Sequence, residues 1–257
     1  MTDIAPRVTG APLARPAAPL TTLPGMDIRI VNDPDGVADL AAASIARWLR
    51  DTPGRADLSL AGGGTPRATY LRLREEEVPW EGVDVWMGDE RWVPPDHPEN
   101  NGRMAREALM DHVPARFHAV PWEAGDPDQA AAAYARTLRG FIADDGTGPR
   151  PGVVVLGIGD DGHTASLFPD GSALSERERI YVADDVPGKG WRVTATMPLL
   201  TGARRIAFLA TGTAKAGAVA AVLEEGRDLP ARRVATTARG EVTWFLDRQA
   251  AAGLRRV

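Results

Sequence analysis

The feature that most restricts the fold of this sequence is the alternation of short apolar runs with amphipathic segments. Runs rich in β-forming residues predict buried strands, and apolar residues at helical spacing predict helices between them. Strands that alternate with helices favour a mostly parallel sheet covered on both faces. Strands are expected at residues 28–31, 58–61, 83–87, 153–157, 193–197, 206–210 and 242–246, and helices at 36–50, 66–74, 101–110, 127–142 and 213–225. We therefore predict one α/β domain over residues 26–257, preceded by a disordered Ala/Pro-rich tail at 1–25.

The segment VVVLGIGDDGHTASLFP at 153–169 is the most informative part of the chain. An apolar strand ends there in a glycine-rich turn that carries Asp161 and His163, at a sheet edge where α/β proteins bind ligands. A lone histidine is commonly structural, but Asp161 two residues earlier is placed to orient this imidazole for acid–base chemistry. The glycines also fit the dinucleotide motif G-x-G-x-x-G. We disfavour dinucleotide binding because Pro169 limits the following helix to about two turns.

Two other predicted strands end in polar turns that should meet the same sheet edge. Gly63, Gly64 and Thr65 form a loop that leads into a helix, which makes it either an anion site or a tight turn that needs glycine. The acidic turn after residues 83–87 contains Asp89 and Arg91, which are either site residues or solvated charges. The absence of a P-loop lysine argues against a nucleoside triphosphate.

Two cations late in the chain complete the candidate site. Arg192 begins a predicted strand, and Lys215 lies near the start of a helix. A cation at a helix N-terminus is unfavourable for the helix dipole. Lys215 is therefore either compensated by a neighbouring anion, exposed to solvent at small cost, or part of an anion site.

Composition excludes several classes of function. The formal net charge of −5 gives no basic surface for nucleic acid, and the absence of cysteine excludes thiolate nucleophiles and Cys-ligated zinc. No apolar stretch reaches the length of a membrane span or of a signal-peptide core. His97 has acidic neighbours but no second histidine at a metal-binding spacing, so we expect no metal. A soluble cytoplasmic protein is predicted.

Five blocks of the sequence, in order, resemble those of 6-phosphogluconolactonases, which are relatives of glucosamine-6-phosphate deaminases. The resemblance covers residue 28 to the C-terminus and is carried by LAGGGTP, GDERWVPPDHPENN, LGIGDDGHTASLFP, WRVTATMP and TGTAK. The deaminases have a glutamate five residues after the histidine, in a stretch like DGHIAFNEP. This chain has Phe168 there, which favours the lactonase over the deaminase.

The resemblance implies hydrolysis of 6-phospho-D-glucono-1,5-lactone, a sugar-phosphate ester, without metal or cofactor. His163 would be the general base and Asp161 the residue that orients it. The substrate would be bound by the residues that match the family pattern, namely Gly63, Gly64, Thr65, Asp89, Arg91, Asn101, Arg192 and Lys215. Gly64 stands where the family commonly has serine, which removes a hydroxyl donor but keeps the backbone donor. Asn100 and Asn101 replace a Ser-Asn pair, so the amide of Asn101 is retained.

Two alternatives stay open on the sequence. One is a sugar-phosphate-binding protein without catalysis, and the other is an aldose–ketose isomerase of the deaminase type. For the lactonase we expect a monomer or small homo-oligomer that binds neither nucleic acid nor membrane.

Overall fold

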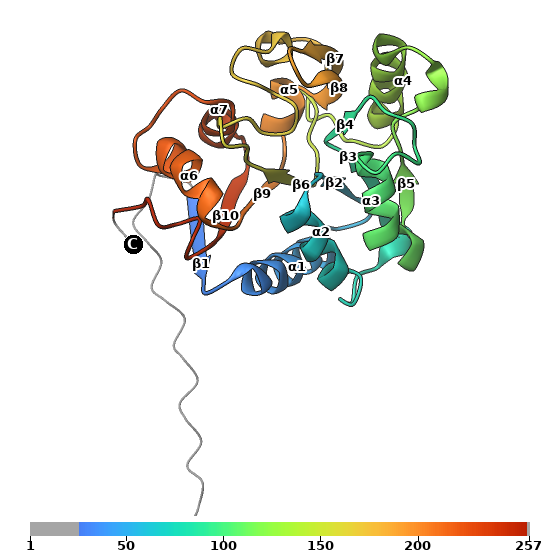
Figure 1. Cartoon of the computed structure of the whole chain (residues 1–257). Coiled ribbons are helices and arrows are strands. Elements are labelled where there is room, and N and C mark those ends of the chain that lie inside the picture. The colour runs from blue at the N-terminus through green and yellow to red at the C-terminus, as the bar shows by residue number, and fades with distance from the viewer. Residues whose placement is uncertain (1–25, 256–257) are drawn as a thin grey trace, which may run out of the picture.

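A seven-stranded parallel sheet forms the centre of the computed structural model, which describes residues 26–255 (Figure 1). Its strand order is β1-β10-β9-β6-β2-β3-β5. The strands are β1 (Met26–Val31), β2 (Ala56–Leu60), β3 (Val83–Met87), β5 (Arg116–His118), β6 (Val153–Gly157), β9 (Arg205–Ala210) and β10 (Glu241–Asp247). All neighbouring pairs are parallel, which confirms the predicted mostly parallel α/β domain. The tail predicted at residues 1–25 lies outside the described residues.

Helices cover both faces of this sheet. The α-helices are α1 (Pro34–Arg50), α2 (Gly64–Leu73), α3 (Asn101–Ala108), α4 (Pro127–Arg139), α5 (Met197–Thr201), α6 (Ala216–Leu223) and α7 (Pro230–Thr237). One apolar core lies between the sheet and α1, α2 and α3, and the other lies between the sheet and α4 to α7. In Figure 1, α1 and α2 lie on the side of the sheet opposite to α5 and α7.

The central strand β6 is buried on both faces, which explains the unbroken apolar run in its sequence. Val153 and Val155 belong to the first core, whereas Val154 and Leu156 belong to the second. Successive side chains of a strand point to opposite faces, so a strand buried on both faces needs an unbroken apolar run. The predicted bounds 153–157 and 83–87 agree with β6 and β3.

Side-chain caps begin three of the helices. Asp33, Asn100 and Asp126 each accept a hydrogen bond from the backbone N–H of the third residue of α1, α3 and α4, respectively. By contrast, α2 begins after Gly63 without a side-chain cap. Among residues 26–255, no helix is long and apolar enough to cross a membrane.

A second, three-stranded antiparallel sheet was not predicted. It contains β4 (Asp89–Arg91), β8 (Gly190–Ala195) and β7 (Tyr181–Val186), in the order β4-β8-β7. The prediction of an acidic turn at residues 88–91 was therefore wrong for Asp89 to Arg91, which pair with Thr194 to Arg192. The strand predicted at 193–197 begins and ends earlier and belongs to this sheet. The elements β5, β7, α5 and α7 were also missed.

A short 3₁₀ turn replaces part of one predicted helix. The helix predicted at 213–225 begins as η5 (Thr213–Lys215) and continues as α6. After Gly162 the chain forms no helix but a turn closed by a bridge between Thr164 and Leu167. That turn shapes the site described next.

Candidate active site

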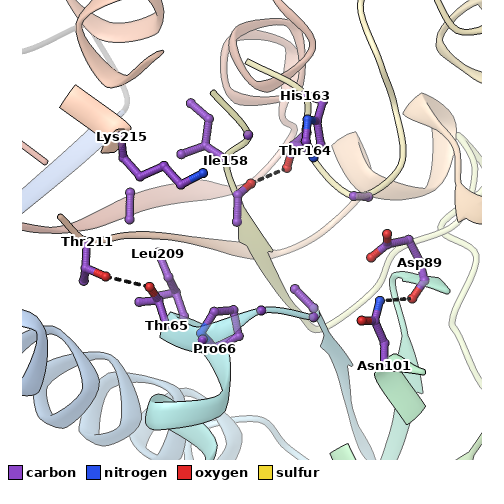
Figure 2. A pocket seen from close by; sticks show the side chains of 18 of the residues that line it. Thr65, Pro66, Asp89, Asn101, Ile158, His163, Thr164, Leu209, Thr211 and Lys215 are labelled. Atoms are coloured by element: carbon purple, nitrogen blue, oxygen red, sulfur yellow. Dashed lines mark hydrogen bonds between the residues drawn. The ribbon is translucent and has the colours of Figure 1, made fainter. Parts of the chain in front are cut away.

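Four parallel strands end at one cavity of about 300 Å³. The residues after β2, β3, β6 and β9 line it, as expected for the carboxyl edge of an α/β sheet. Eight of the predicted site residues are among the lining residues: Gly63, Gly64, Thr65, Asp89, Arg91, Asn101, His163 and Lys215. Figure 2 shows Asp89 and Asn101 on one side, Thr65 and Lys215 on another, and His163 above them. The structure places Asp161 and Arg192 next to lining residues rather than in the lining itself.

The glycine-rich turn after β6 fixes the position of His163. The N–H of Gly159 donates to the carbonyl of His163 at 2.9 Å, and the N–H of Gly162 donates to the carbonyl of Gly159 at 3.0 Å. Gly162 has φ +81°, a left-handed conformation, and Leu229 packs where a Cβ would be. The turn therefore requires glycine at this position for steric reasons as well as for its backbone conformation.

Asp161 holds the imidazole of His163. Its Oδ1 lies 2.5 Å from Nδ1 of His163 and also accepts the backbone N–H of His163 at 3.0 Å. Partial burial raises the pKa of Asp161, but these hydrogen bonds outweigh it and bring the pKa below its ordinary value. An ionised Asp161 can only accept from Nδ1, so the proton of a neutral imidazole lies on Nδ1. The lone pair of Nε2 is then available to take a proton.

Phe168 packs against the other side of this arrangement. Its ring centroid lies 4.4 Å from that of His163, and the side chain is buried. Lys189, from the turn between β7 and β8, lies over the ring of Phe168, with its Nζ 5.1 Å from the ring centroid. Phe168 is the position at which the sequence analysis distinguished the lactonase from the deaminase. Its apolar ring therefore contacts the imidazole of His163.

The loop after β2 lines the cavity at the beginning of α2. Gly63 has φ +104° and lets the chain turn directly into α2. No side chain caps this helix, so no side chain competes with an anion for the N–H groups of its first turn. The hydroxyl of Thr65 bonds that of Thr211 at 2.7 Å, which joins this loop to the end of β9 (Figure 2).

Two arginines lie opposite each other on neighbouring strands. Arg91 of β4 and Arg192 of β8 are direct partners in the antiparallel register. Burial, and then the nearby charge of Arg91, lowers the pKa of Arg192. Like charges directly opposite are destabilising, so the pair favours an anion between or beside them. Arg91 also donates to the carbonyl of Glu99 at 2.9 Å, which orders the loop that follows β4.

Lys215 is paired in this structure. Its Nζ lies 2.7 Å from Oδ1 of Asp160. The sequence left open whether Lys215 is compensated by a neighbouring anion, exposed to solvent or part of an anion site. The structure shows a neighbouring anion, Asp160.

Glu90 and Ser166 do not line the cavity but hold residues that do, a role that the sequence analysis missed. Glu90 is buried and accepts the N–H groups of Arg91, Asn101 and Gly102, at 2.8, 2.7 and 2.7 Å. It thereby ties β4 to the beginning of α3, where the amide of Asn101 donates to the carbonyl of Asp89. The hydroxyl of Ser166 donates to the carboxylate of Asp89 at 2.6 Å. The sequence shows the Glu90 carboxylate shortly after a buried strand, but it does not show that this carboxylate is buried.

Burial of Glu90 predicts a specific pH dependence of stability. Burial raises its pKa from 4.5 to about 7, against the lowering effect of the three N–H donors. The native carboxyl keeps its proton to higher pH than the unfolded one. Its contribution to the free energy of unfolding is therefore greatest below pH 4.5 and is lost as the pH rises to about 7. For Glu90→Gln we expect the decline between pH 5 and pH 8 to be smaller by about 2–3 kcal/mol.

Urea unfolding at the two pH values measures this difference. Asp57, another buried carboxyl whose pKa burial raises to about 6, is present in both proteins and cancels from the comparison. Glu107→Gln, which removes an exposed carboxylate of α3, is the control. Parallel pH dependences of wild type and Glu90→Gln would show that Glu90 is ionised throughout this range.

Comparison with known proteins agrees with the geometry. Residues 32–244 match the model of the family described as glucosamine-6-phosphate isomerases/6-phosphogluconolactonase. A 6-phosphogluconolactonase of a Synechocystis species is 40% identical over 209 residues, which cover 79% of this chain and 86% of that protein. The 6-phosphogluconolactonase of Mycobacterium tuberculosis is 37% identical over 229 residues, covering 85% and 90%. The solved structure of 6-phosphogluconolactonase from Trypanosoma brucei matches with a TM-score of 0.80 at 28% identity, covering 91% of this chain and all of that one.

Proposed function

Because this chain belongs to the family of glucosamine-6-phosphate isomerases and 6-phosphogluconolactonases, we infer that it hydrolyses 6-phospho-D-glucono-1,5-lactone to 6-phospho-D-gluconate in the pentose phosphate pathway. Membership in this family confirms the resemblance carried by the sequence motifs. The observation that supports the proposed mechanism is the hydrogen bond between Asp161 and His163. His163 lines the same cavity as Arg91 and Lys215.

In the first step of the proposed mechanism, a water molecule attacks the lactone carbonyl. Nε2 of His163 takes one proton from this water as the new C–O bond forms. Asp161 keeps the other ring nitrogen protonated and stabilises the imidazolium that results. The carbonyl oxygen becomes an alkoxide, which needs donors that are already in place, and backbone N–H groups of the glycine turns are the candidates.

In the second step the ring C–O bond breaks. The alkoxide re-forms a carbonyl, the ring oxygen leaves, and the imidazolium of His163 returns its proton to that oxygen. The product is an open-chain carboxylic acid that ionises at neutral pH. One residue thus serves as base and then as acid, and the pair with Asp161 is reset for the next substrate.

The phosphate of the substrate carries close to two negative charges at neutral pH. We assign it to Arg91, Arg192, Lys215 and the N–H groups at the beginning of α2. The uncapped helix and the facing arginines support this assignment, because both are satisfied by an anion. Asp89 and Asn101 are assigned to sugar hydroxyls or to ordering of the loop.

Phe168 is the local reason to prefer the lactonase over the deaminase. An apolar ring lies against His163 where a deaminase would have a carboxylate. A phenylalanine neither accepts nor donates a proton, so the second acid–base group of an aldose–ketose isomerisation is not available at this position.

The test of the function uses freshly prepared lactone coupled to 6-phosphogluconate dehydrogenase, corrected for spontaneous hydrolysis. We expect lactone hydrolysis to accelerate and glucosamine 6-phosphate to release no ammonia. Ammonia release without lactone acceleration would favour the deaminase. Binding of the phosphate ester without turnover would favour a sugar-phosphate sensor. We also propose a cytoplasmic location and a monomer or small homo-oligomer, which fractionation and sedimentation would measure.

Arg192→Lys separates phosphate binding from chemistry. A lysine keeps the charge but cannot grip two phosphate oxygens in the way a guanidinium does. We expect the KM for the lactone to rise about tenfold while kcat changes less than about twofold, since the lost contact is made in ground state and transition state alike. Steady-state kinetics on fresh lactone give both constants. Equal losses in kcat and kcat/KM with an unchanged KM would contradict this role.

A further inference from the structure

An ion pair crosses from the catalytic turn to Lys215. Asp160, the residue before Asp161, has Oδ1 2.7 Å from Nζ of Lys215. Lys215 lines the cavity, whereas Asp160 lies outside the lining. Figure 2 shows the Lys215 side chain extending toward Ile158, at the end of β6. The ammonium proposed to bind the substrate phosphate is therefore already occupied by a carboxylate of the protein.

We propose that Asp160 is a specificity-determining residue that competes with the substrate phosphate for Lys215 and so limits how tightly the site holds anions. This inference rests on the proposed function. In this proposal the carboxylate of Asp160 weakens binding of the phosphate, whereas the cations of the site strengthen it.

The energetics of the pair allow such competition. The side chain of Asp160 is 73% exposed and that of Lys215 is 31% exposed. An ion pair in such a position is worth only about 0.2–1 kcal/mol, so a phosphate with close to two charges can displace the carboxylate. Asp160 then remains beside the cavity as a free negative charge. Its repulsion acts on every anion in the site and is reduced by salt.

The repulsion from Asp160 acts more strongly on product than on substrate. Hydrolysis converts the neutral lactone group into a carboxylate, so the product carries one more negative charge than the substrate. The additional charge forms close to His163, three residues from Asp160 on the same turn. Asp160 therefore favours release of the product at the cost of a higher KM for the substrate.

The test removes the charge with little change of shape. For Asp160→Asn we expect the dissociation constants of inorganic phosphate and of 6-phosphogluconate, measured by titration calorimetry at low ionic strength, to fall about twofold to fivefold. The KM for the lactone should fall in the same direction, and product inhibition should appear at lower 6-phosphogluconate. High salt should reduce all of these differences.

Two further variants make the result specific. Asp39→Asn breaks a comparable exposed ion pair, with Arg72 at 2.8 Å, and removes the same charge, so it should leave anion binding unchanged. In a Lys215→Gln background, Asp160→Asn should have a smaller effect, less than about twofold, since there is no ammonium to compete for and only the screened repulsion remains. A double-mutant cycle expresses this coupling directly.

Unchanged or weaker anion binding by Asp160→Asn would overturn the proposal. A gain in affinity of the same size in the Lys215→Gln background would also overturn it, because repulsion alone would then explain the effect. Failure of the proposed function has a different result, since wild type would bind phosphate but would not accelerate lactone hydrolysis. Phosphate binding by neither wild type nor Asp160→Asn would reject the phosphate assignment and the competition together.

Discussion

Replacement of His163 by alanine is expected to lower kcat for the lactone by about 10²–10⁴-fold, the range that general acid–base groups contribute. The KM should change little, because the proposed phosphate contacts come from other segments of the chain. Initial rates on fresh lactone, with spontaneous hydrolysis subtracted, measure both constants. The residual rate comes from the backbone donors and from orientation of the substrate, which the substitution leaves in place.

His112→Ala is the matched control for this prediction. His112 lies in the short turn η2 (Met110–His112), where its Nε2 is 3.1 Å from the carbonyl of Glu107. It is away from the cavity, so its loss should leave kcat and KM near wild type. Turnover of His163→Ala close to that of the control would remove His163 from the mechanism, whatever its distance from Asp161.

A methyl group added at Gly159 is expected to disrupt the pair of Asp161 and His163, although neither of these residues is replaced. A Cβ built on Gly159 would overlap Nδ1 and Cε1 of His163 and would approach Oδ1 of Asp161. The imidazole must then move, and a displacement of about 1 Å costs about 10²-fold in rate. For Gly159→Ala we therefore expect kcat to fall about 10- to 100-fold, with a smaller change in KM.

The backbone at Gly159 gives this prediction its specificity. Its φ lies outside the left-handed region, so alanine brings crowding but no conformational strain. Gly217→Ala is the control, because Gly217 has open space around its Cα and lies in α6. That variant should keep full activity and gain about 0.5–1 kcal/mol in stability. Near-normal kcat for Gly159→Ala would mean that the position of His163 relative to Asp161 is not critical.

The main sheet was predictable because its strands are buried on both faces. Continuous apolar runs and glycine-rich ends are visible without a structure, and they predicted β3 and β6 to the residue. Strand β4 was not predictable in this way. Asp89, Glu90 and Arg91 have no apolar pattern, and they form a strand because they pair with β8, about a hundred residues later. Tertiary pairing overrides local preference there.

The same distinction applies to the site. Residues that directly follow parallel strands, such as Thr65 and His163, were expected to meet because topology requires it. The roles of Glu90 and Asp160 depend on burial and on side-chain contacts between distant segments. The register that brings Arg91 opposite Arg192 depends on the pairing of β4 with β8, and β4 was not recognised as a strand. Such relations follow from the assembled structure and not from spacing.

The position of β1 has a consequence for the order in which the chain can assemble. Within residues 26–255, β10 is the strand that pairs with β1, and it is the last strand to be made. At the usual 5–20 residues per second, translation from Val31 to Glu241 takes about 10–40 s. Throughout that time β1 and the inner face of α1 have no complete sheet to dock against. In the nascent chain β1 thus has no partner strand until the final segment emerges, so the first residues that the structure describes are among the last to reach their native pairing.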